Sequence, residues 1–190
     1  MSTMQPIRTE DDIKRLKDYF LQKGEIRNWA MIVMGINLPI RISDILNLYW
    51  MDVYNFAASS FRKHLVLEEK KTGKKNILAL NDNVVMALRR MQDEGDYSPE
   101  KHIFRAYSNS TTALTRVSAY LIIKKAADEL GMEDIGCHSL RKTFGYHAWK
   151  KGVHLAVIMS IYNHSYIQVT KRYLGIEQDD KDEVMDLLQL

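Results

Sequence analysis

Cysteine and long apolar runs are scarce in this chain of 190 residues. The one cysteine, Cys137, excludes an internal disulfide and a cysteine-based zinc site, and it suits a reducing cytosol. No uncharged apolar run approaches the length of a membrane span, and the first residues lack the pattern of a secretion signal. There is no internal repeat and no low-complexity linker. We therefore expect a single domain over 1–190, in the cytoplasm, with no membrane partner.

Several common catalytic motifs are also missing. The six histidines show neither His-x-x-x-His nor His-Glu-x-x-His spacing. The chain has no glycine-rich phosphate loop, no dinucleotide-binding glycine turn and no serine nucleophile elbow. Metal-dependent hydrolysis, ATP use and α/β-hydrolase chemistry therefore lose support.

Charge is present but unevenly spread, although the net charge is only +3. Residues 101–172 contain eleven basic and four acidic side chains, whereas residues from 173 onward contain one lysine and six acids. A basic body with an acidic end favours a polyanionic partner, with a tail that avoids this partner or packs on a basic surface.

The apolar periodicity predicts a mostly α-helical fold with a small antiparallel β-sheet, an α+β class. The residues 70–75, Lys-Lys-Thr-Gly-Lys-Lys, have the composition of a hairpin tip. The expected strands are 52–56, 63–68 and 76–80. The expected helices are 9–24, 26–36, 40–50, 82–92, 115–130, 139–150, 154–161, 166–173 and 179–188.

Two pairs of polar residues stand at expected helix starts. Arg41 lies three residues before Asp44, which could orient its guanidinium, and the alternative is an ordinary surface ion pair. His138 and Arg141 are also three residues apart, so an anion there would meet an imidazole, a guanidinium and free backbone N–H groups. The alternative for the second pair is a helix cap beside a surface arginine.

The residues 162–173, Tyr-Asn-His-Ser-Tyr-Ile-Gln-Val-Thr-Lys-Arg-Tyr, resemble the end of the tyrosine recombinase, or phage integrase, catalytic domain. In that family the last tyrosine follows the last histidine by nine residues, as Tyr173 follows His164 here. Residues 41–46 resemble the first arginine box, 71–73 the lysine hairpin and 138–144 the His-x-x-Arg box. All the boxes occur in the family's order, and the resemblance spans about 5–188.

The resemblance implies a site-specific DNA recombinase or integrase that works through a covalent 3′-phosphotyrosyl intermediate. Tyr173 would attack the phosphorus, while Arg41, Arg141 and His164 would hold the phosphate oxygens. His138 would handle the tyrosine proton and Lys71 would protonate the leaving 5′ oxygen. Asp44 would support Arg41.

Double-stranded DNA is the implied partner, and no metal or other cofactor is expected. Self-association on DNA up to a tetramer, accessory DNA-bending proteins and a nucleoid location also follow from the resemblance. The expected DNA contacts outside the catalytic set are Lys70, Lys74, Lys75, Lys142 and Arg172.

The chain departs from the family pattern in several places. Leu38-Pro39 replaces the usual Thr-Gly before the first arginine, Asn163 replaces a glycine before His164, and Ala79 stands where a proline often ends the hairpin strand. The N-terminal core-binding domain that usually precedes the catalytic domain is expected to be absent. The acidic tail, about 174–190, is expected to form a short amphipathic helix that docks on its own body or on a neighbouring protomer.

Two other functions remain open. One is a nicking and closing activity like that of a type IB topoisomerase, without strand exchange. The other is a non-catalytic DNA-binding regulator with the same fold, although the complete set of six catalytic residues argues against it.

Overall fold

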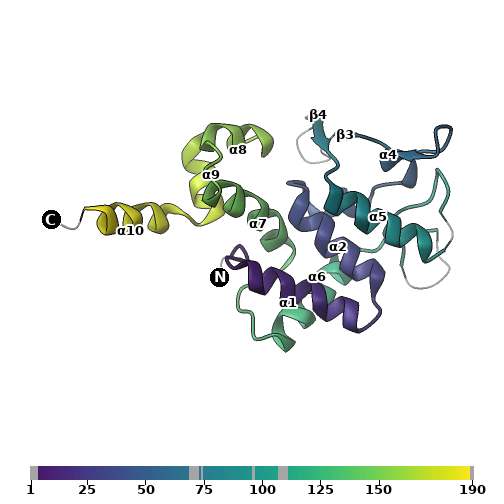
Figure 1. Ribbon diagram of the computed structural model, residues 1–190, viewed down its shortest axis with the longest axis horizontal. Coiled ribbons are helices and arrows are strands. Elements are labelled where there is room, and N and C mark those ends of the chain that lie inside the picture. Colours follow the sequence, from purple (N-terminus) through teal and green to yellow (C-terminus); the bar gives the residue numbers. More distant parts are fainter. Residues whose placement is uncertain (1–3, 69–72, 74, 96, 107–110, 189–190) are drawn as a thin grey trace.

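The computed structural model describes residues 4–68, 73, 75–95, 97–106 and 111–188. It is mostly helical with two small antiparallel sheets, so the expected fold class is confirmed (Figure 1). The helices are α1 Glu10–Gln22, α2 Ile26–Asn37, α3 Ile42–Leu46, α4 Trp50–Val53, α5 Asp82–Asp93, α6 Arg116–Glu129, α7 Cys137–Lys150, α8 Leu155–Ile161, α9 Ile167–Leu174 and α10 Glu177–Leu187. The strands are β1 Tyr54–Asn55, β2 Ser60–Phe61, β3 His64–Glu68 and β4 Lys75–Ala79.

Helix α2 is the centre of the main hydrophobic core. Its residues 28–35 are all buried, because α1, α5 and α7 pack around it. Helices with apolar residues on every side belong inside a protein, and the sequence of α2 contains no charged residue after Arg27. A second, smaller cluster joins α7, α8 and α9 through Tyr146, Ile158, Tyr162, Leu174 and Ile176.

The β structure differs from the expected single sheet. The hairpin β3–β4 is as expected, with Leu65 opposite Leu78. The first expected strand, 52–56, is shorter and pairs instead with β2, in a separate two-stranded sheet with Tyr54 opposite Phe61.

The expected helix over 40–50 is wrong, because α3 ends at Leu46 and a new turn, α4, begins at Trp50. The intervening segment pairs with a later part of the chain: the Ile103 amide donates to the Leu48 carbonyl at 3.0 Å, and the Trp50 amide donates to the Lys101 carbonyl at 3.0 Å. Long-range backbone pairing of this kind is invisible in local periodicity and overrides it.

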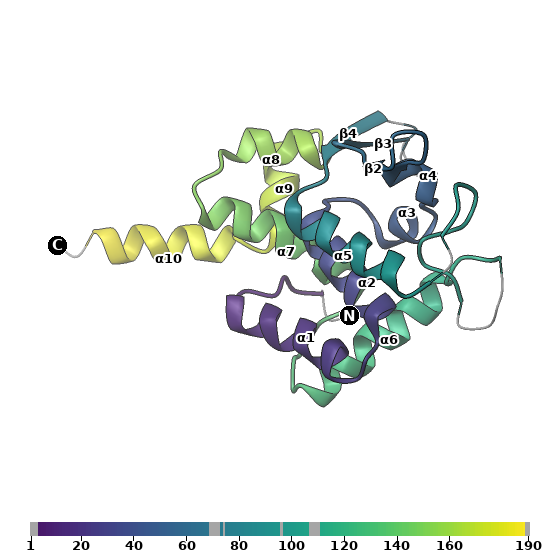
Figure 2. The ribbon, with the colours of Figure 1, turned by 45° about the vertical axis from the view of Figure 1, so that its right-hand side comes forward.

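The last helix, α10, projects away from the rest of the molecule in both ribbon views (Figures 1 and 2). Its apolar side chains Val184, Met185 and Leu187 are 49%, 74% and 75% exposed. The body of the chain therefore does not cover the apolar side of this helix. Among the described residues, no helix is both long and apolar enough to cross a membrane.

Candidate active site on helices α7 and α9

Helix α7 carries the His-x-x-Arg box and lies between α2 and α9 because two glycines allow close packing. A Cβ on Gly35 of α2 would lie 2.6 Å from Leu140 Cδ1. On the other side of α7, a Cβ on Gly145 would lie 2.6 Å from Leu174 Cδ2 of α9. Such distances are too short for real Cβ atoms, so glycine at both positions sets the depth at which α7 sits.

Arg141 is buried, with only 4% of its surface exposed. Its Nε donates to the Pro39 carbonyl at 2.9 Å, and its Nη2 lies 3.5 Å from the Tyr162 carbonyl oxygen. The guanidinium also lies over the Tyr162 ring, 4.9 Å from its centroid. These contacts fix the plane of the guanidinium, while neither hydrogen bond uses Nη1.

His164 is held by contacts that the sequence did not reveal. Its Nδ1 shares a hydrogen bond of 3.0 Å with Oγ1 of the buried Thr170, and its ring stacks on Tyr162 at 5.3 Å between centroids. The preceding Asn163 has φ of 56°, in the left-handed region that asparagine tolerates better than most residues. The replacement of the family's glycine by Asn163 therefore keeps the backbone turn that presents His164.

Tyr173 lies next to these residues. Its ring is 5.3 Å from the His164 ring and 5.8 Å from the Arg141 guanidinium carbon. The hydroxyl is buried and forms no hydrogen bond of normal geometry within the described part of the chain. Burial raises the pKa of Tyr173, against the opposing effect of the Arg141 and Arg41 charges, so the phenol stays protonated at neutral pH.

Arg41 and His138 line a cavity of about 310 Å³ together with Arg116 and Ser43. Arg41 is the N-cap residue of α3 and not part of its first turn.

Burial lowers the pKa of His138, and the positive charges of Arg141, Arg116, Lys142 and Arg41 lower it further. The imidazole is therefore neutral near pH 7 and able to accept a proton. In the same cavity, burial raises the pKa of Cys137 to about 11.

Asp44 is 8% exposed, so it lies inside the fold as a residue supporting Arg41 would. Among the expected DNA contacts, Arg172 and Lys75 are exposed. The residues Lys70, Lys71 and Lys74 lie outside the described residues.

Lys142 is not on the surface, so its expected contact with DNA is wrong for this structure. It is 5% exposed, and its Nζ donates to the Met4 carbonyl at 2.7 Å. Burial lowers the pKa of Lys142. Its ammonium also lies 5.3 Å from the centroid of the Tyr173 ring, so Lys142 contributes to the site from within the protein.

Three contributors to the site were missed from the sequence. Tyr162 and Thr170 were within the quoted 162–173 motif, but nothing in their spacing distinguished them from ordinary core residues. Arg116 had a signal, since it directly follows a threonine at a helix start in the basic stretch 101–172. Its proximity to His138 required the tertiary structure.

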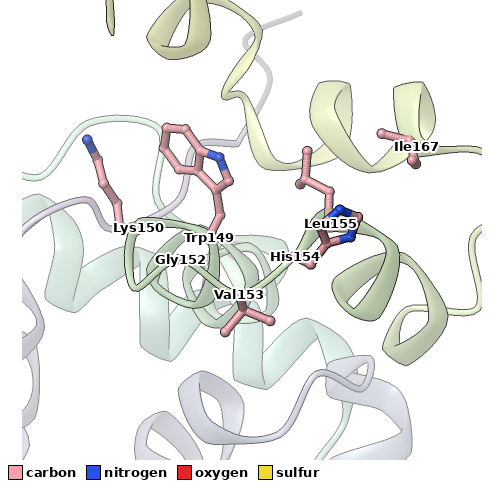
Figure 3. A pocket seen from close by; sticks show the side chains of 7 residues that line it. All are labelled: Trp149, Lys150, Gly152, Val153, His154, Leu155 and Ile167. Atoms are coloured by element: carbon pink, nitrogen blue, oxygen red, sulfur yellow. The ribbon is translucent and has the colours of Figure 1, made fainter.

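A second cavity, of about 610 Å³, lies at the junction of α7, α8 and α9. Figure 3 shows Trp149 at the end of α7, Leu155 at the start of α8 and Ile167 at the start of α9 around this space, with Lys150 at one side. None of the expected catalytic residues that the structure describes lines it.

The chain belongs to the phage integrase family, whose model matches residues 7–179. It is 35% identical over 179 residues to the probable integrase/recombinase YoeC of Bacillus subtilis, which covers 94% of this chain and 93% of the relative. It is 22% identical to the tyrosine recombinase XerA of Pyrococcus horikoshii, over 96% of this chain but only 61% of that protein.

Solved structures agree on the fold. The crystal structure of a XerA recombinase matches 99% of this chain and 67% of its own with a TM-score of 0.74 at 20% identity. The XerH recombinase in a post-cleavage complex with its difH substrate matches 100% of this chain and 55% of its own with a TM-score of 0.75 at 17% identity. Membership of this family identifies the protein as a tyrosine-type site-specific recombinase, an enzyme that acts through a covalent tyrosine intermediate.

Proposed function

We propose that Tyr173 is the nucleophile with which this recombinase breaks and rejoins double-stranded DNA. The observation that carries the proposal is the grouping of His164 and Arg141 around Tyr173. The Tyr173 ring centroid lies 5.3 Å from that of His164 and 5.8 Å from the Arg141 guanidinium carbon. A phosphodiester needs a nucleophile and donors for its oxygens, and this group contains both.

In the proposed step, the Tyr173 oxygen forms a bond to phosphorus as the bond to the 5′ oxygen breaks, which leaves a 3′-phosphotyrosyl link. The phenol proton passes to His138, and the 5′ oxygen takes a proton from Lys71. The raised pKa of Tyr173 makes a base necessary, and the lowered pKa of His138 makes its imidazole free to act as that base. Rejoining is the reverse of this step.

The phosphate would be held by Arg41, Arg141 and His164. Guanidinium groups match two phosphate oxygens at once, which lysine does not. Both arginines lower the pKa of Tyr173 and of His138, so both guanidinium charges act on the nucleophile and on the base. The same charges would stabilise an anion bound near Tyr173, and the buried Asp44 is the proposed supporting residue of Arg41.

The test is covalent capture of DNA. The protein is incubated with sheared DNA of its host and with a random library of nicked duplexes, and adducts that survive detergent are isolated and sequenced. We expect an adduct with the wild type and none with Tyr173→Phe. The variant Tyr166→Phe, at a tyrosine of α9's N-cap that is 69% exposed, is the matched control and should retain the adduct.

The same experiment separates the two other functions. An adduct that persists in Tyr173→Phe contradicts the assignment of the nucleophile. DNA binding without any adduct favours the non-catalytic regulator. An adduct that reseals supercoiled plasmid but never exchanges strands between two recovered sites favours the topoisomerase-like activity.

We further propose that the protein assembles on DNA through α10. The helix exposes Val184, Met185 and Leu187, and the cavity of Figure 3 offers apolar side chains together with Lys150 to an acidic helix. The proposed occupant is α10 of a second copy of this chain, which combines apolar and acidic side chains. The alternative is docking of α10 on its own body, where Lys150 lines a cavity with Asp182, Asp186 and Leu187 of the same chain. Because the proposed substrate is double-stranded DNA, we also propose a nucleoid location, with DNA-bending proteins as accessory partners where distant sites must meet.

Leu187→Asp tests this assembly. We expect it to abolish multimers on the recovered DNA duplex, as measured by sedimentation, while a single copy still binds. Met86→Asp, at a methionine of α5 that is 45% exposed, is the control and should leave multimers intact. Multimers that survive Leu187→Asp contradict the role of α10.

A further inference from the structure

The N-terminal segment, residues 4–8, packs along α7. Its last residue, Arg8, contacts the turn that follows α9, the helix that contains Tyr173. The Ile7 amide donates to Thr143 Oγ1 at 2.8 Å, and His147 Nε2 donates to the Ile7 carbonyl at 2.9 Å. The side chain of Arg8 contacts Gly175 and Asp179, which lie near the C-terminal end of the chain. The segment thus connects the catalytic helix α7 with the junction of α9 and α10.

Arg8 makes three hydrogen bonds at that junction. Its Nη1 donates to both carboxylate oxygens of Asp179 at 2.8 and 2.6 Å, and its Nη2 donates to the Gly175 carbonyl at 3.0 Å. The guanidinium also lies 5.0 Å from the centroid of the Tyr146 ring on α7. One side chain therefore joins α7, the end of α9 and the start of α10.

Gly175 is the residue at which this contact matters most. It ends α9 in the left-handed conformation, with φ of 72°, and only Leu174 separates it from Tyr173. The side chains of Leu174 and Ile176 are completely buried on either side of it. The Gly175 carbonyl is thus the point where the N-terminal segment can fix the position of the last turn of α9.

We infer that Arg8 is a positioning residue for the Tyr173 nucleophile, acting through the Gly175 carbonyl and the Asp179 carboxylate. The inference rests on the proposed role of Tyr173. A helix of eight residues has little stability of its own, so its last turn depends on tertiary contacts. Without Arg8, the last turn of α9 loosens and the Tyr173 hydroxyl leaves its place beside Arg141 more often.

Arg15 provides a matched control. It too joins a carboxylate and a backbone carbonyl, with Nη1 donating to Asp12 at 2.7 Å and Nη2 donating to the Leu130 carbonyl at 2.8 Å. Its side chain is 46% exposed, against 39% for Arg8. Arg15, however, ties α1 to the end of α6, away from α9.

The first measurement needs no DNA. Amide hydrogen exchange is followed in Arg8→Ala, Arg8→Lys, Asp179→Asn and Arg15→Ala. In Arg8→Ala we expect exchange of the Gly175 and Ile176 amides, which bond to the Lys171 carbonyl, to accelerate by about tenfold or more as local opening becomes easier. Arg8→Lys keeps the positive charge but loses the two-pronged guanidinium. The exchange rates of these amides in Arg8→Lys should therefore lie between those of Arg8→Ala and the wild type. Arg15→Ala should leave these amides unchanged.

The second measurement is the rate of adduct formation and the DNA affinity of the same variants on the recovered duplex. We expect Arg8→Ala to slow the covalent step by about tenfold or more at unchanged Kd, because small misplacements of a reacting group cost up to roughly 100-fold. Unchanged exchange, a loss confined to DNA affinity, or a faster covalent step would each overturn the inference. If the wild type forms no adduct, the proposed function fails, whereas the exchange experiment still decides whether Arg8 fixes the end of α9.

Discussion

The Tyr162 hydroxyl donates a hydrogen bond of 2.6 Å to the main-chain carbonyl of Arg141. The same tyrosine stacks on His164 and carries the Arg141 guanidinium over its ring. Tyr162 is 1% exposed, and burial raises its pKa, so it is a permanent hydrogen-bond donor at every physiological pH. Two of the proposed catalytic side chains thus share one buried aromatic support.

Removing the Tyr162 hydroxyl should eliminate its hydrogen bond to the Arg141 carbonyl, while the aromatic ring still fills the core. In Tyr162→Phe we expect the free energy of unfolding to fall by about 1 kcal/mol, the usual net value of one buried hydrogen bond. Urea denaturation measures the change. Tyr166→Phe, which alters an exposed tyrosine, should be neutral, and equal stability of the two variants would contradict the role of the Tyr162 bond.

Gly145 sets the distance between α7 and α9. In Gly145→Ala, the new methyl group would meet Leu174 at 2.6 Å and the Tyr162 ring at 2.7 Å, so overpacking should cost about 1–3 kcal/mol of stability. Thermal unfolding monitors this loss, and covalent capture should show slower adduct formation because Tyr173 moves with Leu174. Lys124→Ala, at a lysine on the surface of α6 and away from α9, should change little, and a fully stable Gly145→Ala would show that the helices can separate freely.

The two arginines should matter most for the rate of cleavage. We expect Arg41→Ala and Arg141→Ala each to slow adduct formation by about 10²–10³-fold, the usual effect of removing a donor that stabilises charge in the transition state. Single-turnover assays at saturating DNA isolate this effect from binding. Arg89→Ala, at an exposed arginine of α5, should keep the wild-type rate. A loss smaller than about tenfold would contradict the phosphate role of either arginine.

The pH dependence of cleavage follows from His138 and Tyr173. Because the pKa of His138 lies below 6.5, the neutral base is present at pH 7 and is lost only as the pH falls through that lower value. Because the pKa of Tyr173 lies above 10, no gain from tyrosinate formation is expected between pH 7 and 9. The rate should therefore be flat from about pH 7 to 9 and fall in acid.

Single-turnover rates across this range, in wild type and His138→Gln, provide the measurement. The acid limb should disappear in His138→Gln, which has no titrating imidazole. A rate that climbs steadily with pH in the wild type would show that Tyr173 ionises without His138.

Much of the fold was predictable because local patterns and tertiary packing agree over most of the helices. The helix over 26–36 and the pairing of the expected strands 63–68 and 76–80 are examples in which the local sequence pattern sufficed. The helix over 40–50 failed because Leu48 and Trp50 pair with residues more than fifty positions away. Local sequence patterns cannot predict a backbone pairing between segments so far apart in the chain.

The candidate site was predictable to a similar degree. The order and spacing of the boxes indicated Arg41, His138, Arg141, His164 and Tyr173, and the structure brings His164, Arg141 and Tyr173 together. Lys142 was expected to contact DNA, whereas it is 5% exposed and its ammonium donates to the Met4 carbonyl inside the fold. The supporting Tyr162 and Thr170 carried no signal that separated them from core residues.

The sequence by itself determined which residue types are available for the proposed chemistry and in what order, because the tyrosine, the arginines and the histidines must be encoded one by one. It also determined the uneven charge, with a basic stretch before an acidic tail. Only the tertiary structure decided which cations lie near Tyr173, which of them are buried, and which N-terminal side chain contacts the end of α9. Those relationships depend on packing and burial between distant segments, and neither spacing nor composition contains them.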